Sequence, residues 1–488
     1  MNLPKVFVIY TGGTIGSRNI DVGNPLSPLV PSSFDEVLKD VKTYNKKDKI
    51  LFFDNASVKI DTYSFEDPID SSDINAADWK ILTRLIEENY KYYDGFVILH
   101  GTDTMAYTAS ALTFMCKNIC KPIIFTGSQR PIVRTRTDAD QNLVSAIEIA
   151  ASKPLRGIDI PEVCVFFRNK LLRGCRTTKF SAKEYDGFMS HNYPVLGEAD
   201  EVISIHKKQL KILKKEPCSF NSDFNPSIIC LTILPGIDPN LIRTIITSKY
   251  IKAIILRSYG SGNTPTNSNF HEAISEGIKE GKIIFNISQC PSGFVRQGLY
   301  KASTSLMSAG VISGVDLTLE AAYCKLGKLL AEENDIDIIK DKLQINYHGE
   351  QSHSTFNIHF KINGMVQHRD TVSFSQKPVI DDFNLIFDKE VENAYLKIFD
   401  LSPTNSPVNA EITVYLGIES AKGGEEKILL GIKKFNDIHA VSRPVIFNVN
   451  LDQLDIINID LNNHKVTITS KNIDYKNCRI ELAIASND

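Results

Sequence analysis

Short apolar runs without polar alternation constrain the fold of this chain more than any other feature. Four of them occur early in the chain, at positions 6–10 (VFVIY), 95–99 (GFVIL), 122–125 (PIIF) and 163–167 (VCVFF). A strand buried on both faces has this composition, whereas a strand with one solvated face alternates apolar and polar residues. Segments with a helical apolar stripe lie between the runs, at 76–88, 105–116 and 139–150. This alternation of strand and helix predicts a parallel, doubly wound sheet.

The alternation stops near residue 200 and resumes near residue 226. The intervening stretch is basic and polar and is punctuated by proline and asparagine, which favours an edge hairpin followed by a linker. Strand-like runs then return at 228–234, 253–256 and 283–287, with helical patterns near 240–248, 270–280 and 319–331. We therefore expect an N-terminal α/β domain over residues 1–200, a hairpin and linker over 201–225, and a smaller α/β domain over 226–346.

The period of the apolar residues changes after about residue 347. Apolar and polar residues alternate strictly at 356–362, and again at 412–416 and 466–468, with turn-forming residues between these runs. Short strands with a period of two and no convincing helix are typical of an antiparallel β-sandwich. We expect residues 347–488 to form a β-rich C-terminal domain.

Composition and charge exclude several classes of function. The formal net charge is −3, so the chain has no overall basic field to attract nucleic acid or an anionic membrane. No apolar run approaches the ~20 residues of a membrane span, and the run at 6–10 is too short for the apolar core of a signal peptide. The nine cysteines are an odd number without framework or metal-ligand spacing, so we expect free thiols, no metal site and a cytoplasmic location.

A glycine-rich turn, TGGTIG at positions 11–16, follows the first apolar run directly. Doubly wound sheets bind their ligands at the carboxyl ends of strands. A dinucleotide phosphate loop would require glycine at position 11, where this chain has threonine, and no G-x-x-x-x-G-K-[ST] motif occurs. A hydroxyl at this edge can attack a carbonyl if another group removes its proton, and the turn offers two threonine hydroxyls, those of Thr11 and Thr14.

The run at 95–99 is followed by HGTDT, which brings Thr102 and Asp103 to the same predicted sheet edge. Threonine and aspartate are also good N-cap residues, so capping of the helix expected from Met105 explains this motif equally well by itself.

Two further segments add a cation and more hydroxyls. In RGCRTTK, at 173–179, Lys179 lies next to hydroxyls and can act as a base in a partly dry cleft, although a solvent-exposed basic turn has the same composition. In DSSD, at 70–73, Ser71 and Ser72 are suited to hold an α-carboxylate and an α-amino group. Helix capping is the alternative explanation of that segment.

Taken together, these segments resemble the L-asparaginase family. The motifs TGGTIG, DSSD, HGTDTMAYTASAL, TGSQRP and RGxRTTK occur in the family's order within roughly residues 4–345, and 254–263 (IILRSYGSGN) is similar to a segment of the cytoplasmic type I branch. The resemblance implies two doubly wound domains of the asparaginase type, followed here by an antiparallel β-sandwich-like domain that lies outside it. It also implies hydrolysis of L-asparagine to L-aspartate and ammonia through an acyl-enzyme, without a metal or an organic cofactor.

The resemblance implies the catalytic roles residue by residue. Thr14 matches the primary threonine nucleophile of the family. Thr102, Asp103 and Lys179 match the second threonine and its acidic and basic partners.

Substrate binding and assembly are implied in the same way. Ser71, Ser72 and Asp103 match the residues that hold the amino-acid head of the substrate. Asn263 matches a residue that family members often contribute near the site of a neighbouring subunit, which implies a homodimer or homotetramer with shared active sites.

Some type I members regulate activity through a second asparagine pocket. Thr178, Arg257 and Cys290 match residues of that pocket, and an arginine there can bind an α-carboxylate through two hydrogen bonds. The alternative is that Arg257 forms a structural ion pair and Cys290 lies in the core.

The chain departs from the family at one position. Asn24 stands where type I members have a tyrosine that assists the first threonine, so the proton acceptor of Thr14 is left open. Three alternatives therefore stay beside the asparaginase hypothesis: a broader glutaminase-asparaginase, a catalytically weak asparagine sensor, and, lower in rank, an amidotransferase subunit with a tRNA partner. For the β-rich domain we consider a binding or assembly module and a structural cap on an oligomer.

Overall fold

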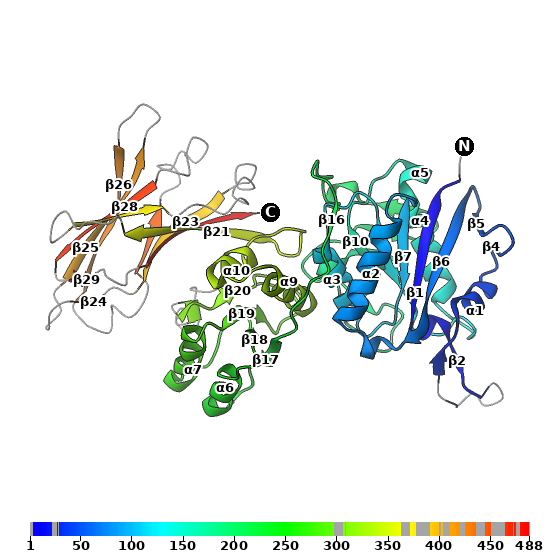
Figure 1. Ribbon diagram of the computed structural model, residues 1–488, viewed down its shortest axis with the longest axis horizontal. Helices are drawn as coiled ribbons and strands as arrows, with labels where there is room; N and C mark the ends of the chain where they lie inside the picture. The colour runs from blue at the N-terminus through cyan, green and yellow to red at the C-terminus, as the bar shows by residue number, and fades with distance from the viewer. Residues whose placement is uncertain are drawn as a thin grey trace.

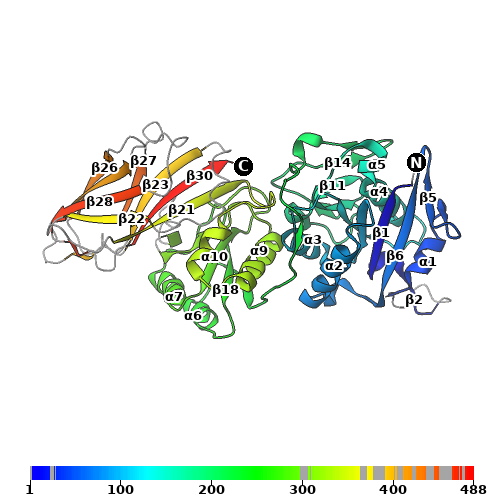
Figure 2. The same ribbon diagram turned by 45° about the horizontal axis from the view of Figure 1, so that its top comes forward.

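The chain folds into three units that follow one another along the long axis of the molecule (Figures 1 and 2). The computed structural model describes residues 3–21, 27, 29–296, 306–307, 309–362, 371–376, 391–399, 402–403, 410–419, 425–435, 445–449, 464–471, 473–474 and 479–487. An N-terminal α/β unit lies at one end, a smaller α/β unit in the middle, and a β unit at the other end (Figure 1).

A ten-stranded sheet forms the centre of the N-terminal unit, in the order β15-β14-β11-β10-β9-β7-β1-β6-β5-β4. Its parallel centre consists of β10 (Val163–Phe167), β9 (Ile123–Thr126), β7 (Gly95–Leu99), β1 (Lys5–Gly12) and β6 (Ala56–Ile69). All residues of β1 after Lys5 are buried, as the uninterrupted apolar run predicts. The chain leaves β1 for β6 on one side and returns to β7 on the other, which creates the crevice where doubly wound sheets bind ligands.

Antiparallel strands flank this parallel centre, so the sheet is mixed. On one side lie β5 (Ile50–Phe53) and β4 (Tyr44–Asn45), and on the other lie β11 (Lys170–Arg173), β14 (Gly197–Ala199) and β15 (Ile203–Ile205). The predicted edge hairpin is the β14 and β15 pair, and its first strand begins before the predicted boundary at residue 201. In the following segment, β16 (Ser219–Phe220) pairs with β8 (Cys116–Lys117).

Helices cover both faces of the large sheet and bury two separate apolar cores. They are α1 (Phe34–Lys39), α2 (Ala76–Asn89), α3 (Met105–Met115), α4 (Ala139–Ala150) and α5 (Ser152–Arg156). Three of them were predicted from the apolar stripe. Helix α2 begins with a capping box formed by Asn75 and Asp78, so capping by the DSSD segment is not what starts this helix.

The smaller α/β unit has a four-stranded parallel sheet with helices on both faces. Its strands, in spatial order, are β17 (Ile228–Thr232), β18 (Ala253–Ser258), β19 (Ile283–Ser288) and β20 (Ile312–Ser313). The core on one face includes residues of α6 (Pro239–Ile246) and α7 (Ser268–Lys279), and the core on the other includes residues of α9 (Leu319–Glu332) and α10 (Ile336–Leu343). The structure confirms the predicted strands and adds α10, which the sequence did not predict.

The C-terminal unit is antiparallel β structure, as predicted. One eight-stranded sheet has the order β26-β25-β28-β22-β21-β30-β23-β27. The strands are β21 (His353–Ile362), β22 (Thr371–Gln376), β23 (Val391–Phe399), β25 (Ala410–Glu419), β26 (Glu425–Phe435), β27 (Val445–Val449), β28 (His464–Lys471) and β30 (Arg479–Asn487), with a separate short pair of β24 (Ser402–Pro403) and β29 (Ile473–Asp474). The outer strands β26 and β27 approach each other, so the sheet is rolled.

Candidate active site

Four segments meet at the carboxyl edge of the parallel strands. After β1 comes the short turn η1 (Thr14–Gly16), after β6 comes η2 (Ser71–Asp73), and after β7 comes the HGTDT segment. The fourth is β12 (Thr178–Lys179), which pairs with β13 (Phe188–Met189). These are the segments that the sequence singled out. The first three lie together because the ends of adjacent parallel strands share one edge, whereas β12 follows the antiparallel strand β11 and reaches this edge through the contact of Lys179 with Thr102.

Three of these loops touch through bare backbone. A side chain at Gly13 would place its Cβ 2.4 Å from the Cα atom of Gly101, and a Cβ on Gly101 would lie 2.5 Å from the Oγ atom of Ser71. Gly13 also has a φ of +88°, which side-chain-bearing residues rarely adopt. The close approach brings together the residues that follow each glycine, Thr14 and Thr102.

Lys179 connects the second threonine to the aspartate. Its Nζ atom donates to the Oγ1 atom of Thr102 at 2.7 Å and to the Oδ1 atom of Asp103 at 2.6 Å. Thr102 is buried and the side chain of Lys179 is 17% exposed, whereas the side chain of Asp103 is 65% exposed. The hydroxyl and the ammonium are thus largely shielded from solvent, whereas the carboxylate is mostly exposed.

The DSSD loop is built to position hydroxyls. The Oγ atom of Ser71 accepts a hydrogen bond from the Asp103 backbone N–H at 3.3 Å, and Thr104 Oγ1 donates to the Ser71 carbonyl at 2.6 Å. Ser72 donates from both its backbone N–H and its hydroxyl to Asp70 Oδ1, each at 2.9 Å. Asp70 therefore fixes Ser72, a role that we did not assign from the sequence. An aspartate whose side chain accepts from the backbone two residues later is a common turn motif, and this local signal could have identified Asp70.

The turn that carries Thr14 is held firmly, but the described structure gives its hydroxyl no base. Ser17 Oγ donates to the Gly13 carbonyl at 3.0 Å, and the Ile132 N–H donates to the Ile15 carbonyl at 3.0 Å. The position of the missing tyrosine, Asn24, lies outside the described residues.

Tyr10 does not replace that tyrosine. Its ring is fully buried and stacks on Phe34, and its hydroxyl packs against Gly16 without a hydrogen-bond partner among the described residues. Burial raises the pKa of Tyr10 well above its usual value, which opposes a role as a proton acceptor.

The residues matched to a second pocket gather around the start of α9. Thr178 Oγ1 donates to Glu320 Oε1 at 2.7 Å, and burial raises the pKa of Glu320. The charge of Arg257 lies near enough to oppose that rise. The Nε atom of Arg257 is buried and has no hydrogen-bond partner within the described part of the chain.

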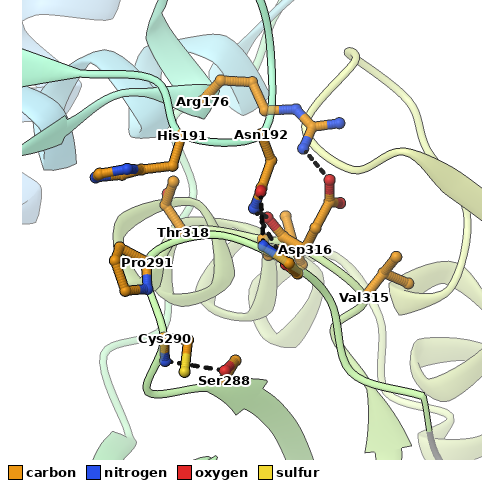
Figure 3. Close-up of a pocket in the computed structure, with 11 residues that line it drawn as sticks. Arg176, His191, Asn192, Ser288, Cys290, Pro291, Val315, Asp316 and Thr318 are labelled. Carbon is orange, nitrogen blue, oxygen red and sulfur yellow. Dashed lines mark hydrogen bonds and ion pairs between the residues drawn. The ribbon is translucent and has the colours of Figure 1, made fainter. Parts of the chain in front are cut away.

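Cys290 lines a pocket between the two α/β units (Figure 3). Its other lining residues include Arg176, Asn192 and Thr318, the N-cap of α9, but neither Thr178 nor Arg257. Asn192 joins the two units, because its side chain accepts from the Gly293 N–H at 3.0 Å and donates to the Gly293 carbonyl at 3.3 Å.

Asn263 belongs to the smaller α/β unit and follows β18. Its backbone pairs with Tyr259, and its Oδ1 atom is buried without a hydrogen-bond partner among the residues described. Within the described residues, no group of three or more His, Cys, Asp and Glu side chains has an arrangement that suits a metal ion. No helix in the described part of the chain is long and apolar enough to cross a membrane.

Family models match both α/β units. The model described as "Asparaginase, N-terminal" matches residues 5–211, and the model described as "Glutaminase/Asparaginase C-terminal domain" matches residues 227–343. The chain belongs to the asparaginase family. Both matches end before β21, so the rolled β unit lies outside them.

Individual relatives agree with this assignment. L-asparaginase 1 of Escherichia coli K12 is 38% identical over 356 residues, which cover 72% of this chain and 98% of that protein. Human 60 kDa lysophospholipase is 33% identical over 359 residues, which cover 71% of this chain and 61% of that protein. The solved structure of L-asparaginase I from Vibrio cholerae superposes with a TM-score of 0.63 at 35% identity and covers 72% of this chain and all of that one. Relatives with different names are therefore similar to this chain, which is an asparaginase-family hydrolase.

Proposed function

We propose that this asparaginase-family protein hydrolyses L-asparagine to L-aspartate and ammonia. The observation that carries the proposal is the contact of Lys179 Nζ with both Thr102 Oγ1 and Asp103 Oδ1, beside the place where Gly13 and Gly101 touch. A threonine hydroxyl that accepts a hydrogen bond from a lysine, in a loop that touches the loop of a second threonine, is an arrangement suited to acyl transfer.

The geometry supports the following course of reaction. Ser71, Ser72 and Asp103 hold the amino-acid head of the substrate, which places the side-chain amide between Thr14 and Thr102. The Thr14 hydroxyl adds to the amide carbonyl, and backbone N–H groups near Gly13 and Gly101 stabilise the oxyanion. The C–N bond then breaks, and the nitrogen leaves as ammonia after it takes up a proton.

A water molecule completes the cycle. It adds to the ester that links the aspartyl group to Thr14, and the ester C–O bond breaks, which releases aspartate and restores the threonine hydroxyl. Lys179 and Thr102 are placed to take a proton from the attacking group in each half of the reaction. None of these steps calls for a metal or an organic cofactor.

We further propose a cytoplasmic homodimer or homotetramer. The unsatisfied, buried Oδ1 atom of Asn263 supports a role for this residue at an interface with a second subunit, because a buried polar atom without a partner is costly. The free thiols of the described cysteines support a reducing compartment.

Ammonia release tests the proposed activity. Purified protein is given L-asparagine and L-glutamine separately over a concentration series. We expect release from asparagine at a much higher kcat/KM than from glutamine, and loss of release in Thr14→Ala. Comparable rates with both amides would favour the broader glutaminase-asparaginase. Binding of asparagine without any release would favour the sensor, and full activity of Thr14→Ala would contradict the assignment of the nucleophile.

A second asparagine site that regulates turnover is supported by Arg257. A buried guanidinium nitrogen without a partner among the described residues is available for a carboxylate, and Thr178 and Glu320 lie nearby to meet an amino group. Turnover against asparagine concentration should then be sigmoidal, and Arg257→Ala should make the curve hyperbolic. A Hill coefficient near one for the unaltered protein would count against this site.

A further inference from the structure

The segment 345–354 connects α10 to the β unit, and we call it the junction strap. It follows the last residue of the matched family domains, yet it is packed inside the molecule: Glu350, Gln351 and Ser354 are each at most 1% exposed. A polar connector would normally run over the surface, so its burial needs a physical explanation.

The first part of the explanation is a buried ion pair between the strap and the smaller α/β unit. Lys325, in α9, contacts Glu350 Oε1 at 2.8 Å and donates to the Ile345 carbonyl and to Gln351 Oε1. Glu350 also accepts from the backbone N–H groups of Tyr347 and His348. Charged and polar partners therefore hold the strap in one conformation.

The second part is Arg176, which belongs to the N-terminal unit and also contacts the strap. Its buried guanidinium donates from Nε to the Gly349 carbonyl at 2.7 Å, from Nη1 to Asp316 Oδ2 at 2.8 Å, and from Nη2 to Ser352 Oγ at 3.3 Å. Ser352 closes the network, since its N–H and its hydroxyl both donate to Asp316. Figure 3 shows the Arg176 guanidinium reaching toward Asp316 across the junction. One planar side chain thus joins both α/β units to the strap.

Arg176 is also three residues before Lys179. The short turn η3 (Gly174–Arg176) leads directly into β12, and Thr177 fixes the turn from within through a hydrogen bond to the Arg173 carbonyl. Gly349 of the strap also packs against the side chain of Arg173, the residue before this turn, because a Cβ on Gly349 would lie 2.1 Å from Arg173 Nη1. Arg176, which contacts the strap, and the active-site lysine therefore lie on one short piece of backbone.

We propose that the junction strap, acting through Arg176, positions Lys179 against Thr102 and so couples the β unit to the active site. Arg176 and Ser352 are positioning residues, since the contacts described for them do not include Thr102 or Asp103. The first strand of the β unit begins at His353, one residue after Ser352. A displacement of that unit would therefore move Ser352 and change its hydrogen bonds with Arg176 and Asp316. The proposal rests on the proposed amide hydrolysis for its kinetic readout.

The kinetic test separates positioning from substrate binding. Ser352→Ala removes only a hydroxyl, and Arg176→Lys keeps the charge but loses the planar fork. We expect kcat for asparagine to fall roughly threefold to tenfold in Ser352→Ala and roughly 10- to 100-fold in Arg176→Lys, with KM changed by less than about threefold. Ser275→Ala is the matched control, because it removes one serine hydroxyl bonded within α7, on the far side of the smaller unit.

A double-mutant cycle decides whether the effect acts through the lysine. In a Lys179→Met background, Ser352→Ala should change the residual kcat by less than about twofold. A drop of the same size in both backgrounds, or no drop in either single variant, would overturn the proposal.

Hydrogen exchange provides a readout that needs no activity. Amides of residues 177–179 should exchange faster in Ser352→Ala than in the unaltered protein, and Ser275→Ala should leave them unchanged. If the unaltered protein released no ammonia while this difference appeared, the proposed reaction would be wrong and the coupling would stand. Unchanged exchange at 177–179 would overturn the coupling whatever the activity.

Discussion

Two lysine and carboxylate pairs in this protein have nearly the same geometry and opposite surroundings. Lys179 and Asp103 lie 2.6 Å apart in the candidate active site, with side chains 17% and 65% exposed. Lys325 and Glu350 lie 2.8 Å apart at the junction, with side chains 1% and 0% exposed. Solvent screens the first pair, whereas the second keeps its full electrostatic interaction and the full cost of desolvation.

The comparison teaches that distance alone does not tell a reactive pair from a structural one. The junction lysine has three acceptors, a carbonyl, an amide oxygen and a carboxylate, none of which can act as a nucleophile in this setting. The active-site lysine instead contacts a threonine hydroxyl besides its carboxylate. We therefore expect substitutions at the two lysines to affect different quantities.

The largest effect is expected for Lys179→Met. Without the ammonium, Thr102 loses its proton-transfer partner, and kcat for asparagine should fall roughly 10²–10⁴-fold. The free energy of unfolding should change by less than about 1 kcal/mol, because the Asp103 carboxylate of the lost pair is 65% exposed and solvent screens it. Steady-state kinetics and urea denaturation of the same preparation measure both quantities. A loss of unfolding free energy without a loss of kcat would contradict the expected difference between the two lysines.

Lys325→Met should give the next largest effect, on stability. It leaves Glu350 as a buried charge without its cation, which costs about 3–5 kcal/mol of unfolding free energy. Urea denaturation measures the loss, provided that the α/β units unfold together. In the paired variant Lys325→Met with Glu350→Gln, at least half of the loss should be recovered because no charge is left uncompensated. Equal losses in the single and paired variants would show that packing, not charge, holds the junction.

The smallest effect is expected from a buried histidine in the HGTDT segment. His100 is buried, and burial lowers its pKa to about 4 from an ordinary value of 6.5. The folded protein therefore keeps the imidazole neutral at pH values where the unfolded chain protonates it. The resulting stability is complete above pH 6.5 and is lost as the pH falls toward 4, by about 3 kcal/mol.

Denaturation between pH 7 and pH 4 tests this dependence. His100→Gln should have a shallower loss of unfolding free energy over that range than the unaltered protein. His348→Gln makes the same test at the junction, where burial and Lys211 lower the pKa of His348 as well. If His100→Gln and the unaltered protein gave parallel curves, burial of His100 would not be the source of acid sensitivity.

Much of the fold could be predicted because buried parallel strands leave continuous apolar runs. The strands β7 and β10 begin and end where the runs at 95–99 and 163–167 do. Strand β6 was missed although it lies next to β1, because Lys59 and Asp61 interrupt its apolar residues and much of its length is only partly buried. Helix α10 was missed although α6, which also has eight residues, was predicted, because the apolar stripe of α10 is less pronounced.

The loops that carry the candidate site could be predicted from the sequence, but the strap that contacts the segment before Lys179 could not. Thr102, Asp103 and Lys179 stand in short motifs, and the structure brings them into contact as expected. The sequence of the strap contains no short motif that predicts its burial. Its burial depends on Arg176 and Lys325, which lie far from it in sequence, and no local pattern in a polar segment reveals a distant partner.

The contact between Gly13 and Gly101 has a practical consequence for anyone who wishes to alter the substrate preference of this protein. A library that randomises Gly13 would consist mostly of variants whose two threonine loops are forced apart, and one that randomises Gly101 would force the Thr102 loop away from Ser71. Diversity is better introduced at Ser72, which is exposed and tied down only through Asp70. Directed evolution of the candidate site should therefore vary Ser72 and keep Gly13 and Gly101 unchanged.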